Sequence, residues 1–398
     1  MMLLNRVQTQ LLALKEQRLQ RFRRTVDQAD GVQMVVDGHP MLAFCSNDYL
    51  GLANDAGLAQ ALCEGVQRYG VGAGASHLIS GHSRAHALLE AQLATLLSAN
   101  IPSAQALFFS TGYMANLGLL GGLAILAPDT EIFSEALNHA SLIDGMRMAR
   151  TRVRVFPHRD MASLEQLLAA STSSNKVVVT DSVFSMDGSV ADVPALLDLC
   201  RRYEAWLVVD DAHGFGVLGA SGLGVLEHFG LHDERLLYMG TLGKAAGVSG
   251  AFVCAHEDVV SWLVQRSRPY IYTTAAAPAL AHALLRSLAL IVEQEGQQRR
   301  AQLKQNISHL QQSLLQRHWR LMPSETAIQP LLVGDNGQAL ALSARLFEQG
   351  LWVPAIRPPT VPDGTARLRI ALSAAHTPAQ ISRLAEAINF LEAQMPRS

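Results

Sequence analysis

The sequence contains only four cysteines in 398 residues, Cys45, Cys63, Cys200 and Cys254, and none of them forms a C-x-x-C pair. This wide spacing excludes a disulfide-stapled scaffold and a zinc finger, and it indicates free, buried thiols in a reducing compartment. No apolar run approaches the roughly twenty residues that a membrane helix needs. The start of the chain has too short an apolar stretch, and no small-residue cleavage site, for a secretory signal. We therefore expect a cytoplasmic protein.

The sequence also has no excess of charge of either sign. Its 32 lysines and arginines nearly balance its 34 acidic residues, which gives a net charge of −2. A global basic field that could hold nucleic acid is therefore absent. Hydrophobic residues make up 49% of the chain and charged residues 17%, which is typical of a globular enzyme and excludes a disordered chain. At roughly one to two hundred residues per domain, the length predicts two or three domains.

Short β-rich runs alternate with helical patterns through the middle of the chain. Near-continuous apolar strands separated by helices are typical of a mostly parallel sheet that helices cover on both faces. The sequence therefore predicts an α/β fold with a seven-stranded sheet. The seven runs are 106–109, 131–133, 153–156, 177–180, 206–210, 236–239 and 251–254.

The two ends of the chain show different patterns. Apolar residues at steps of three and four predict an amphipathic helix at the N-terminus, and a basic stretch, Arg21–Arg24, follows it. A long helical pattern at 279–316 ends the alternation, and a mixture of strands and helices follows. We expect an N-terminal helix and arm over 1–48, a large α/β domain over 49–285 and a smaller α+β domain over 286–398. The C-terminal strands are expected at 327–333, 351–355 and 368–372, and the helices at 339–349 and 378–392.

Polar residues follow several predicted strands, at the edge where ligands collect in an open parallel sheet. The segment 110–116 opens a helix, and its free backbone N–H groups could bind a phosphate. Asp210 ends one apolar strand, His139 follows another, and Lys244 lies among glycines and alanines after a third. Each feature alone has an ordinary explanation: a helix N-cap, an aspartate that caps amides, a hydrogen-bonded histidine, or a lysine whose ammonium group reaches water.

Together these four features are much more specific, because they are expected at one edge of one sheet. Pyridoxal 5′-phosphate needs donors for its phosphate, an amine that forms a Schiff base, an acid that keeps the pyridine nitrogen protonated, and a flat group that fixes the ring plane. Burial lowers the pKa of an amine and makes it nucleophilic. The sequence therefore predicts a pyridoxal-phosphate site around Lys244.

Three other motifs match their usual functions poorly. Residues 214–219 follow G-x-G-x-x-G after a strand, but small residues replace the expected helix and no acid ends the next strand. Residues 243–244 lack the first glycine and the Ser/Thr of a Walker loop. His82 and His86 could share a helix face, but Ser83 stands where a zinc protease has glutamate. We expect ordinary surface or core histidines there and predict no metal site.

Several longer motifs occur in a fixed order, at 47–51, 72–74, 138–141, 183–188, 210–214 and 241–244. In this order they resemble the α-oxoamine synthases, fold-type I pyridoxal-phosphate enzymes that join an amino acid to an acyl thioester with loss of carbon dioxide. The similarity covers nearly the whole chain from about Arg21. It implies an aminotransferase-like fold and a homodimer with active sites at the subunit interface. Within the family, segments 328–336 and 355–369 most resemble the members that condense L-alanine with a pimeloyl thioester in biotin biosynthesis.

The resemblance also implies roles for individual residues. It makes Lys244 the Schiff-base residue and catalytic base, pairs Asp210 with the pyridine nitrogen, and stacks His139 on the ring, near the acyl oxygen. Asn47 and Arg369 are implied to bind the amino acid's carboxylate. The implied cofactor-binding residues are Gly112, Tyr113, His139, Ser185, Asp210, His213, Thr241 and Lys244. The implied substrate-binding residues are Arg21, Asn47, His139, Arg357, Thr360 and Arg369.

Some alternatives stay open at this point. The acyl carrier is either coenzyme A or an acyl carrier protein, and the basic stretch Arg21–Arg24 suits both. A glycine-using member of the same family is the nearest alternative. A nicotinamide-dependent oxidoreductase that uses residues 214–219, and a cofactor-free acyl-thioester binding protein, are more distant ones.

Overall fold

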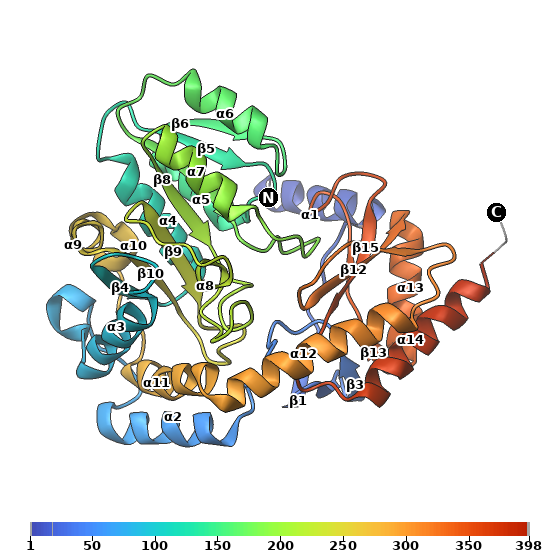
Figure 1. Cartoon of the computed structure of the whole chain (residues 1–398). Coiled ribbons are helices and arrows are strands. Elements are labelled where there is room, and N and C mark those ends of the chain that lie inside the picture. The colour runs from blue at the N-terminus through green and yellow to red at the C-terminus, as the bar shows by residue number, and fades with distance from the viewer. Residues whose placement is uncertain (1, 18, 396–398) are drawn as a thin grey trace.

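A seven-stranded sheet forms the centre of residues 104–256 in the computed structural model, which describes residues 2–17 and 19–395 (Figure 1). Its strands are β4 (Ala104–Phe109), β5 (Glu131–Glu135), β6 (Arg152–Phe156), β7 (Lys176–Asp181), β8 (Ala205–Asp210), β9 (Leu236–Thr241) and β10 (Ala251–His256). They lie in the order β4-β10-β9-β8-β7-β5-β6. In this sheet β10 runs in the direction opposite to that of the other six strands. The predicted mostly parallel, seven-stranded sheet is confirmed.

Helices pack on both faces of this sheet, which explains why its strands are nearly continuous apolar runs. Successive strand residues point to opposite faces, so Leu207 and Val209 join one hydrophobic cluster while Val208 joins another. The helices of this region are α2 (Ala56–Tyr69), the π-helical turn η1 (His77–Gly81), α3 (Arg84–Leu97), α4 (Gly112–Ala124), α5 (Ala140–Ala149), α6 (Met161–Ala169), α7 (Val193–Arg202), α8 (Val225–His228), α9 (Glu257–Arg266), α10 (Arg268–Ile271) and α11 (Pro278–Val292).

The C-terminal part forms a second, smaller body beside the large sheet, with α12 running between them (Figure 1). Its helices are α12 (Gln294–Ser313), α13 (Asn336–Glu348) and α14 (Pro378–Ala393), and its strands are β11 (Arg320–Leu321), β12 (Ile328–Gly334), β13 (Leu351–Trp352), β14 (Ala355–Ile356) and β15 (Ala366–Ala371). β11, β12, β15 and β14 form one sheet in this order. The single helical pattern expected at 279–316 is two helices, because the backbone is extended at Glu293.

The N-terminal segment contains more than the expected helix and arm. Helix α1 (Met2–Glu16) is present and has no buried residue. Three strands follow it, β1 (Val26–Asp30), β2 (Gln33–Val36) and β3 (His39–Ala43). They form a four-stranded sheet in which β3 pairs in parallel with β13, so this segment joins the C-terminal body. The three-part division of the chain stays a prediction.

The expectations about membrane helices and cysteines can be compared with the structure. Within residues 2–17 and 19–395, no helix combines the length and the apolarity needed to cross a bilayer. The four cysteines are all free. Cys200 and Cys254 are buried as expected, Cys45 is half-buried, and Cys63 is exposed on α2, so the expectation of buried thiols is wrong for Cys63.

Candidate active site

One cavity of about 200 Å³ lies at the carboxyl edge of the large sheet, beside the N-terminus of α4. All eight sequence-predicted cofactor-binding residues line it, together with Asn116, Ser141 and Asp181. These side chains come from five separate loops and strand ends, as the position of ligand sites in parallel sheets predicts. The eight residues are Gly112, Tyr113, His139, Ser185, Asp210, His213, Thr241 and Lys244.

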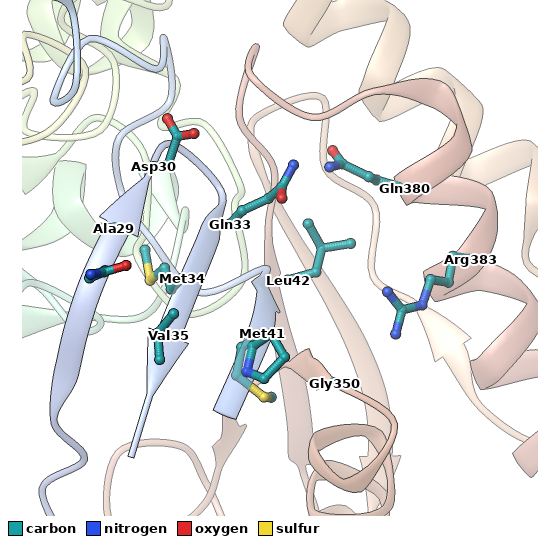
Figure 2. A pocket seen from close by; sticks show the side chains of 12 residues that line it. Ala29, Asp30, Gln33, Met34, Val35, Met41, Leu42, Gly350, Gln380 and Arg383 are labelled. Atoms are coloured by element: carbon teal, nitrogen blue, oxygen red, sulfur yellow. The ribbon is translucent and has the colours of Figure 1, made fainter. Parts of the chain in front are cut away.

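A larger cavity, of about 710 Å³, lies between the sheet of β1–β3 and α14 (Figure 2). Its described lining includes Asp30 and Arg383 but no histidine, lysine or cysteine. Size does not identify the site, because another cavity, of about 930 Å³ beside α12, is larger still. The chemistry favours the smaller one, because it brings an amine, two imidazoles and two carboxylates together.

A chain of hydrogen bonds begins at Lys244. Its Nζ lies 2.9 Å from Nε2 of His213, and Nδ1 of His213 lies 2.6 Å from the hydroxyl of Tyr49. That hydroxyl donates to Oδ1 of Asn47 at 3.1 Å, which also accepts from Nη2 of Arg369 at 3.2 Å. Because the tyrosine proton is directed to Asn47, the chain assigns the His213 proton to Nδ1 and makes Nε2 the acceptor for the Lys244 amine.

Burial controls the protonation of this chain. It lowers the pKa of Lys244 to about 8, although the charges of Asp210 and Asp181 act in the opposite direction. Burial, followed by the charge of Lys244, lowers the pKa of His213 well below its ordinary value. His213 is therefore a neutral imidazole at pH 7 that accepts from the lysine without adding positive charge beside it.

The carboxylate of Asp210 lies in the same cavity and is buried. Its Oδ2 accepts from Nδ2 of Asn116 at 2.7 Å and its Oδ1 from the N–H of Ala212 at 3.0 Å. Nδ2 of Asn116 also donates to Ser141, whereas Oδ1 of Asn116 is buried without a partner. A buried carboxylate beside an unpaired carbonyl oxygen is suited to a charged N–H group. The pyridinium nitrogen of pyridoxal phosphate is such a group, so these residues fit it.

The other end of the cavity fits a phosphate. Backbone N–H groups at the first turn of α4 have no helical acceptor, and the helix dipole favours an anion there. A Cβ on Gly112 would lie 2.7 Å from Cγ2 of Thr241. Only glycine therefore lets this turn approach the end of β9 so closely.

His139 caps α5, and this fixes its tautomer. Its Nδ1 accepts from the N–H of Ser141 at 3.2 Å, with the Ser141 hydroxyl at 2.7 Å. Burial lowers the pKa of His139, which favours the neutral ring. The single ring proton is then on Nε2, which can donate to a substrate oxygen.

The two adjacent acids of the 210–214 motif point to opposite faces of β8. Asp211 is buried away from the cavity, where it accepts from the hydroxyls of Ser182 and Tyr238 and from the N–H of Val225. A Cβ on Gly214 would overlap the Asp211 carboxylate. Gly214 therefore makes room for a structural acid, and no long helix begins at residues 214–219 as a dinucleotide site would require.

The predicted substrate-binding residues are only partly assembled. Asn47 and Arg369 meet each other, and Nε of Arg369 also donates to the Ser185 carbonyl at 2.6 Å. Arg21 and Thr360 are exposed, and neither lines the cavity around Lys244. Arg357, also outside the cavity lining, is half-buried. The roles of these residues stay predictions.

Four residues of the site were not singled out from the sequence: Tyr49, Asn116, Ser141 and Asp181. The first three lie inside the motif segments 47–51, 110–116 and 138–141, but nothing in those segments distinguishes them. Asp181 is the last residue of β7, and it pairs in register with Asp210, the last residue of β8. A polar residue at the end of an apolar strand was therefore an available signal for Asp181.

Comparison with known proteins agrees with this geometry. The sequence profile of aminotransferase class I and II matches residues 39–388. The 8-amino-7-oxononanoate synthase of Janthinobacterium sp. (strain Marseille) is 58% identical over 388 residues, which cover 98% of this chain and 98% of that relative. The chain belongs to the aminotransferase class I and II family. Within this family it groups with the 8-amino-7-oxononanoate synthases, so the resemblance to α-oxoamine synthases is confirmed.

Solved structures of family members have the same fold. The 8-amino-7-oxononanoate synthase from Francisella tularensis is 30% identical, with a TM-score of 0.75 over 89% of this chain and 98% of that one. A structure of serine palmitoyltransferase with a pyridoxal-phosphate internal aldimine is 27% identical, with a TM-score of 0.89 over 97% of this chain and 96% of that one. The predicted fold-type I aminotransferase-like fold is confirmed.

Proposed function

We propose that this protein is a pyridoxal-phosphate-dependent acyltransferase of biotin biosynthesis. It condenses L-alanine with a pimeloyl thioester and gives 8-amino-7-oxononanoate, carbon dioxide and the free thiol. The observation that carries this proposal is the convergence of Lys244, Asp210 and His139 in one cavity, in a chain 58% identical to a relative of that name.

The residues that line the cavity would hold the cofactor in the roles that the family resemblance implies. The N–H groups of Gly112 and Tyr113, with Thr241, would hold the phosphate, and Asp210 would pair with the pyridine nitrogen. His139 would pack on the ring face, with His213 and Ser185 beside the ring, and Lys244 would attach the group covalently. When bound, pyridoxal phosphate supplies an electron-withdrawing ring that stabilises negative charge on the α-carbon of the amino acid.

Arg369 and Asn47 bind and orient the amino acid. The guanidinium of Arg369 is already held by the Ser185 carbonyl and by Asn47, so little side-chain freedom is lost when it pairs with the alanine carboxylate. The proton that must then be removed is the one on the α-carbon of L-alanine.

Lys244 removes that proton. With a pKa of about 8, about a tenth of its amine is neutral at pH 7, far more than for an exposed lysine. His213 accepts a hydrogen bond from the amine and so orients its lone pair. His139 donates from Nε2 to the thioester oxygen while the new carbon–carbon bond forms, because negative charge develops on that oxygen.

The proposal includes a homodimer with active sites at the subunit interface. Helix α1 supports the dimer, because no residue of it is buried and its leucines face solvent in the single chain. Exposed apolar patches of this kind mark surfaces that another protein covers. Sedimentation at micromolar concentration should therefore give a dimer, and a stable monomer would contradict this part of the proposal.

The acyl chain and its carrier are the finer part of the proposal. Arg21, Arg357 and Thr360 contact the pimeloyl thioester, and the basic stretch Arg21–Arg24 suits the phosphate groups of either coenzyme A or an acyl carrier protein. Parallel assays with the two carriers would distinguish them.

The deciding experiment has two steps. The visible spectrum of the purified protein is recorded first, and L-alanine is then added. Carbon dioxide release is next measured with alanine or glycine across pimeloyl, acetyl and succinyl thioesters. We expect a cofactor absorbance that alanine changes, and release that depends on alanine and pimeloyl thioester together. Release that prefers glycine would assign the chain to another α-oxoamine synthase activity.

A further inference from the structure

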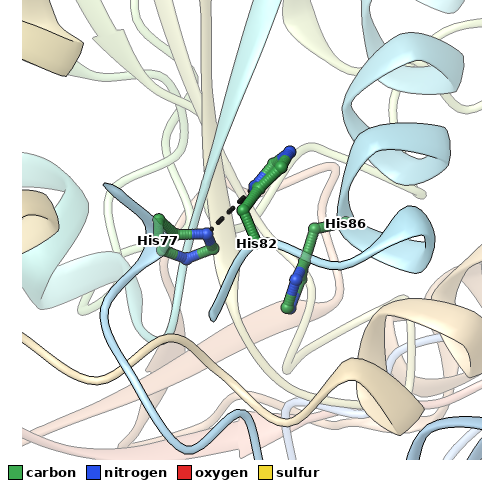
Figure 3. A group of neighbouring side chains, drawn as sticks. All are labelled: His77, His82 and His86. Carbon is green, nitrogen blue, oxygen red and sulfur yellow. Dashed lines mark hydrogen bonds between the residues drawn. The ribbon is translucent and has the colours of Figure 1, made fainter. Parts of the chain in front are cut away.

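Three imidazoles outside the active-site cavity meet at the start of α3 (Figure 3). His77 belongs to η1, His82 to the turn that follows it, and His86 to the first turn of α3. Each offers one ring nitrogen within 4.8 Å of the other two. His77 and His86 are buried and His82 is partly open to solvent. We propose that these three histidines form a site for a divalent first-row transition metal ion such as Zn²⁺.

The spacing of two of the ligand atoms already suits such an ion. Nδ1 of His77 lies 3.1 Å from Nδ1 of His82. Zinc binds imidazole nitrogen at about 2.0–2.1 Å in tetrahedral sites, which places two ligand nitrogens about 3.3 Å apart. The distance between the two nitrogens would therefore change little if an ion replaced the proton that the rings now share, and both rings would turn so that their lone pairs point at the ion.

The opposite nitrogens of His82 and His86 face oxygen acceptors. Nε2 of His82 lies 3.7 Å from Oε2 of Glu90, and Nε2 of His86 lies 3.0 Å from the carbonyl oxygen of Ala276. Metal-binding histidines usually donate their second N–H to a carboxylate or a backbone carbonyl, which fixes the tautomer and the ring orientation. With Nε2 of each ring directed to an acceptor, Nδ1 is the nitrogen that could bind the ion.

His77 is oriented by stacking instead. Its ring lies 4.6 Å from the ring of Tyr270, with an angle of 9° between the planes. This contact fixes the plane of His77 while its Nδ1 faces His82. His77 and His86 are therefore held by neighbours other than the proposed ion, whereas His82 has only the longer contact of 3.7 Å with Glu90.

One existing contact must be exchanged on binding. Nδ1 of His86 accepts from the N–H of Ser83 at 3.1 Å, with the Ser83 hydroxyl at 3.2 Å. This contact keeps Nδ1 unprotonated, which is the form that binds metal. Ser83 is half-buried, so water can satisfy its N–H once the ion takes the nitrogen. A water molecule also suits the fourth position, on the open side of His82.

Imidazole binds a metal ion through an unprotonated ring nitrogen, and a neutral histidine ring offers one such nitrogen. Nitrogen ligands of this kind prefer zinc, copper, nickel or cobalt to magnesium or calcium.

An ion here would connect three segments of the chain. The N–H of Ala275 donates to the carbonyl of Ala75 at 2.9 Å, and His86 contacts the carbonyl of Ala276. The loop around Ala275 is thus already joined to α3 and to the residues just before η1. Because the ion binds the folded chain, occupancy should raise the melting temperature.

The test uses the holoenzyme without a histidine tag. It is titrated with Co²⁺, dialysed and analysed for bound metal, and the d–d absorbance of tetrahedral cobalt is followed at wavelengths beyond the cofactor bands. Melting curves are recorded with and without Zn²⁺. The variants are H77Q, H82Q and H86Q, with H39Q as a control on an exposed histidine of β3. H82Q is the most informative, because His82 is partly exposed and its replacement should leave the fold intact.

We expect one cobalt ion per chain, a tetrahedral spectrum and a zinc-dependent rise in melting temperature, all retained in H39Q. H77Q and H82Q should weaken cobalt binding by at least about 100-fold and H86Q by at least about 10-fold, in line with the loss of a ligand. Absence of bound metal in the wild type would overturn the proposal and leave a hydrogen-bonded histidine cluster. Metal binding that H77Q and H82Q leave unchanged would overturn it too.

Discussion

The amine of Lys244 lies 2.9 Å from Nε2 of His213, and this imidazole contacts the hydroxyl of Tyr49 at 2.6 Å. The lysine is therefore connected through two side chains to Asn47, which contacts Arg369. In the proposed reaction, the group that removes the proton and the group that binds the carboxylate belong to one hydrogen-bonded chain. The position of each consequently depends on the others.

The first prediction concerns Lys244 itself. Lys244→Ala removes the base and the covalent attachment, but it leaves the donors for the phosphate and Asp210 in place. We expect turnover to fall below detection while the protein still binds pyridoxal phosphate weakly and reversibly. Carbon dioxide release and equilibrium dialysis of the cofactor would measure the two effects. A near-normal rate in this variant would show that another group is the base.

The neighbouring acids Asp210 and Asp211 allow a matched comparison. Asp210→Asn should lower the rate by orders of magnitude, because a neutral partner no longer keeps the pyridine nitrogen charged. It should lower the melting temperature less than Asp211→Asn does, because Asp210 accepts from two donors rather than three. Asp211 accepts from three donors in the interior. Asp211→Asn should therefore destabilise the fold by about 1–3 kcal/mol. Rate measurements and thermal melts of both variants check the contrast, and the opposite pattern would exchange the two roles.

The sequence predicted the large sheet well and the site only in part. Runs such as the one in β8 are apolar because helices cover both faces of the sheet. Each strand can therefore be predicted from its own residues. Strand alternation places Asp210 and Asp211 on opposite faces, but only the packing tells which face holds the cavity. The contact of Asn47 with Arg369 joins residues 322 positions apart. No local pattern contains that contact.

There are also physical reasons why the sequence did not predict strand β1 or the histidine cluster. All five residues of β1 are exposed, so it lacks the alternation that marks a half-buried strand. Ser83 takes the place of the glutamate of a zinc-protease helix, so the spacing of His82 and His86 alone predicts no metal site. His77 joins the group only because η1 folds back on α3, which the spacing in the sequence does not indicate.

A third prediction tests the pH dependence of the base. Because burial places the pKa of Lys244 near 8, its active neutral form increases as the pH rises through 8. Exchange of the α-proton of L-alanine with deuterated water, measured without thioester by NMR, should therefore rise with pH and level off above about 8. A rate that is independent of pH between 6 and 9 would contradict the assignment.

Tyr49 is expected to act through His213 as a positioning residue. Tyr49→Phe removes the hydroxyl that fixes the His213 tautomer, but it keeps the buried ring. We expect the exchange rate to fall about 10-fold, in the range of a lost hydrogen bond, and its pH midpoint to move. A merely structural role would lower the melting temperature and leave that midpoint in place.

The last prediction separates two arginines on β15. Arg369 contacts Ser185 and Asn47, whereas Arg367 contacts the carbonyls of Thr365 and Met186. Arg369→Lys keeps the positive charge but loses the paired N–H geometry that a carboxylate prefers. It should raise the KM for L-alanine about 10- to 100-fold, which corresponds to one or two lost hydrogen bonds to a charged group. It should change the KM for the thioester much less. Arg367→Lys should leave the KM for alanine near its wild-type value. Equal effects of the two substitutions on the alanine KM would mean that the carboxylate binds elsewhere.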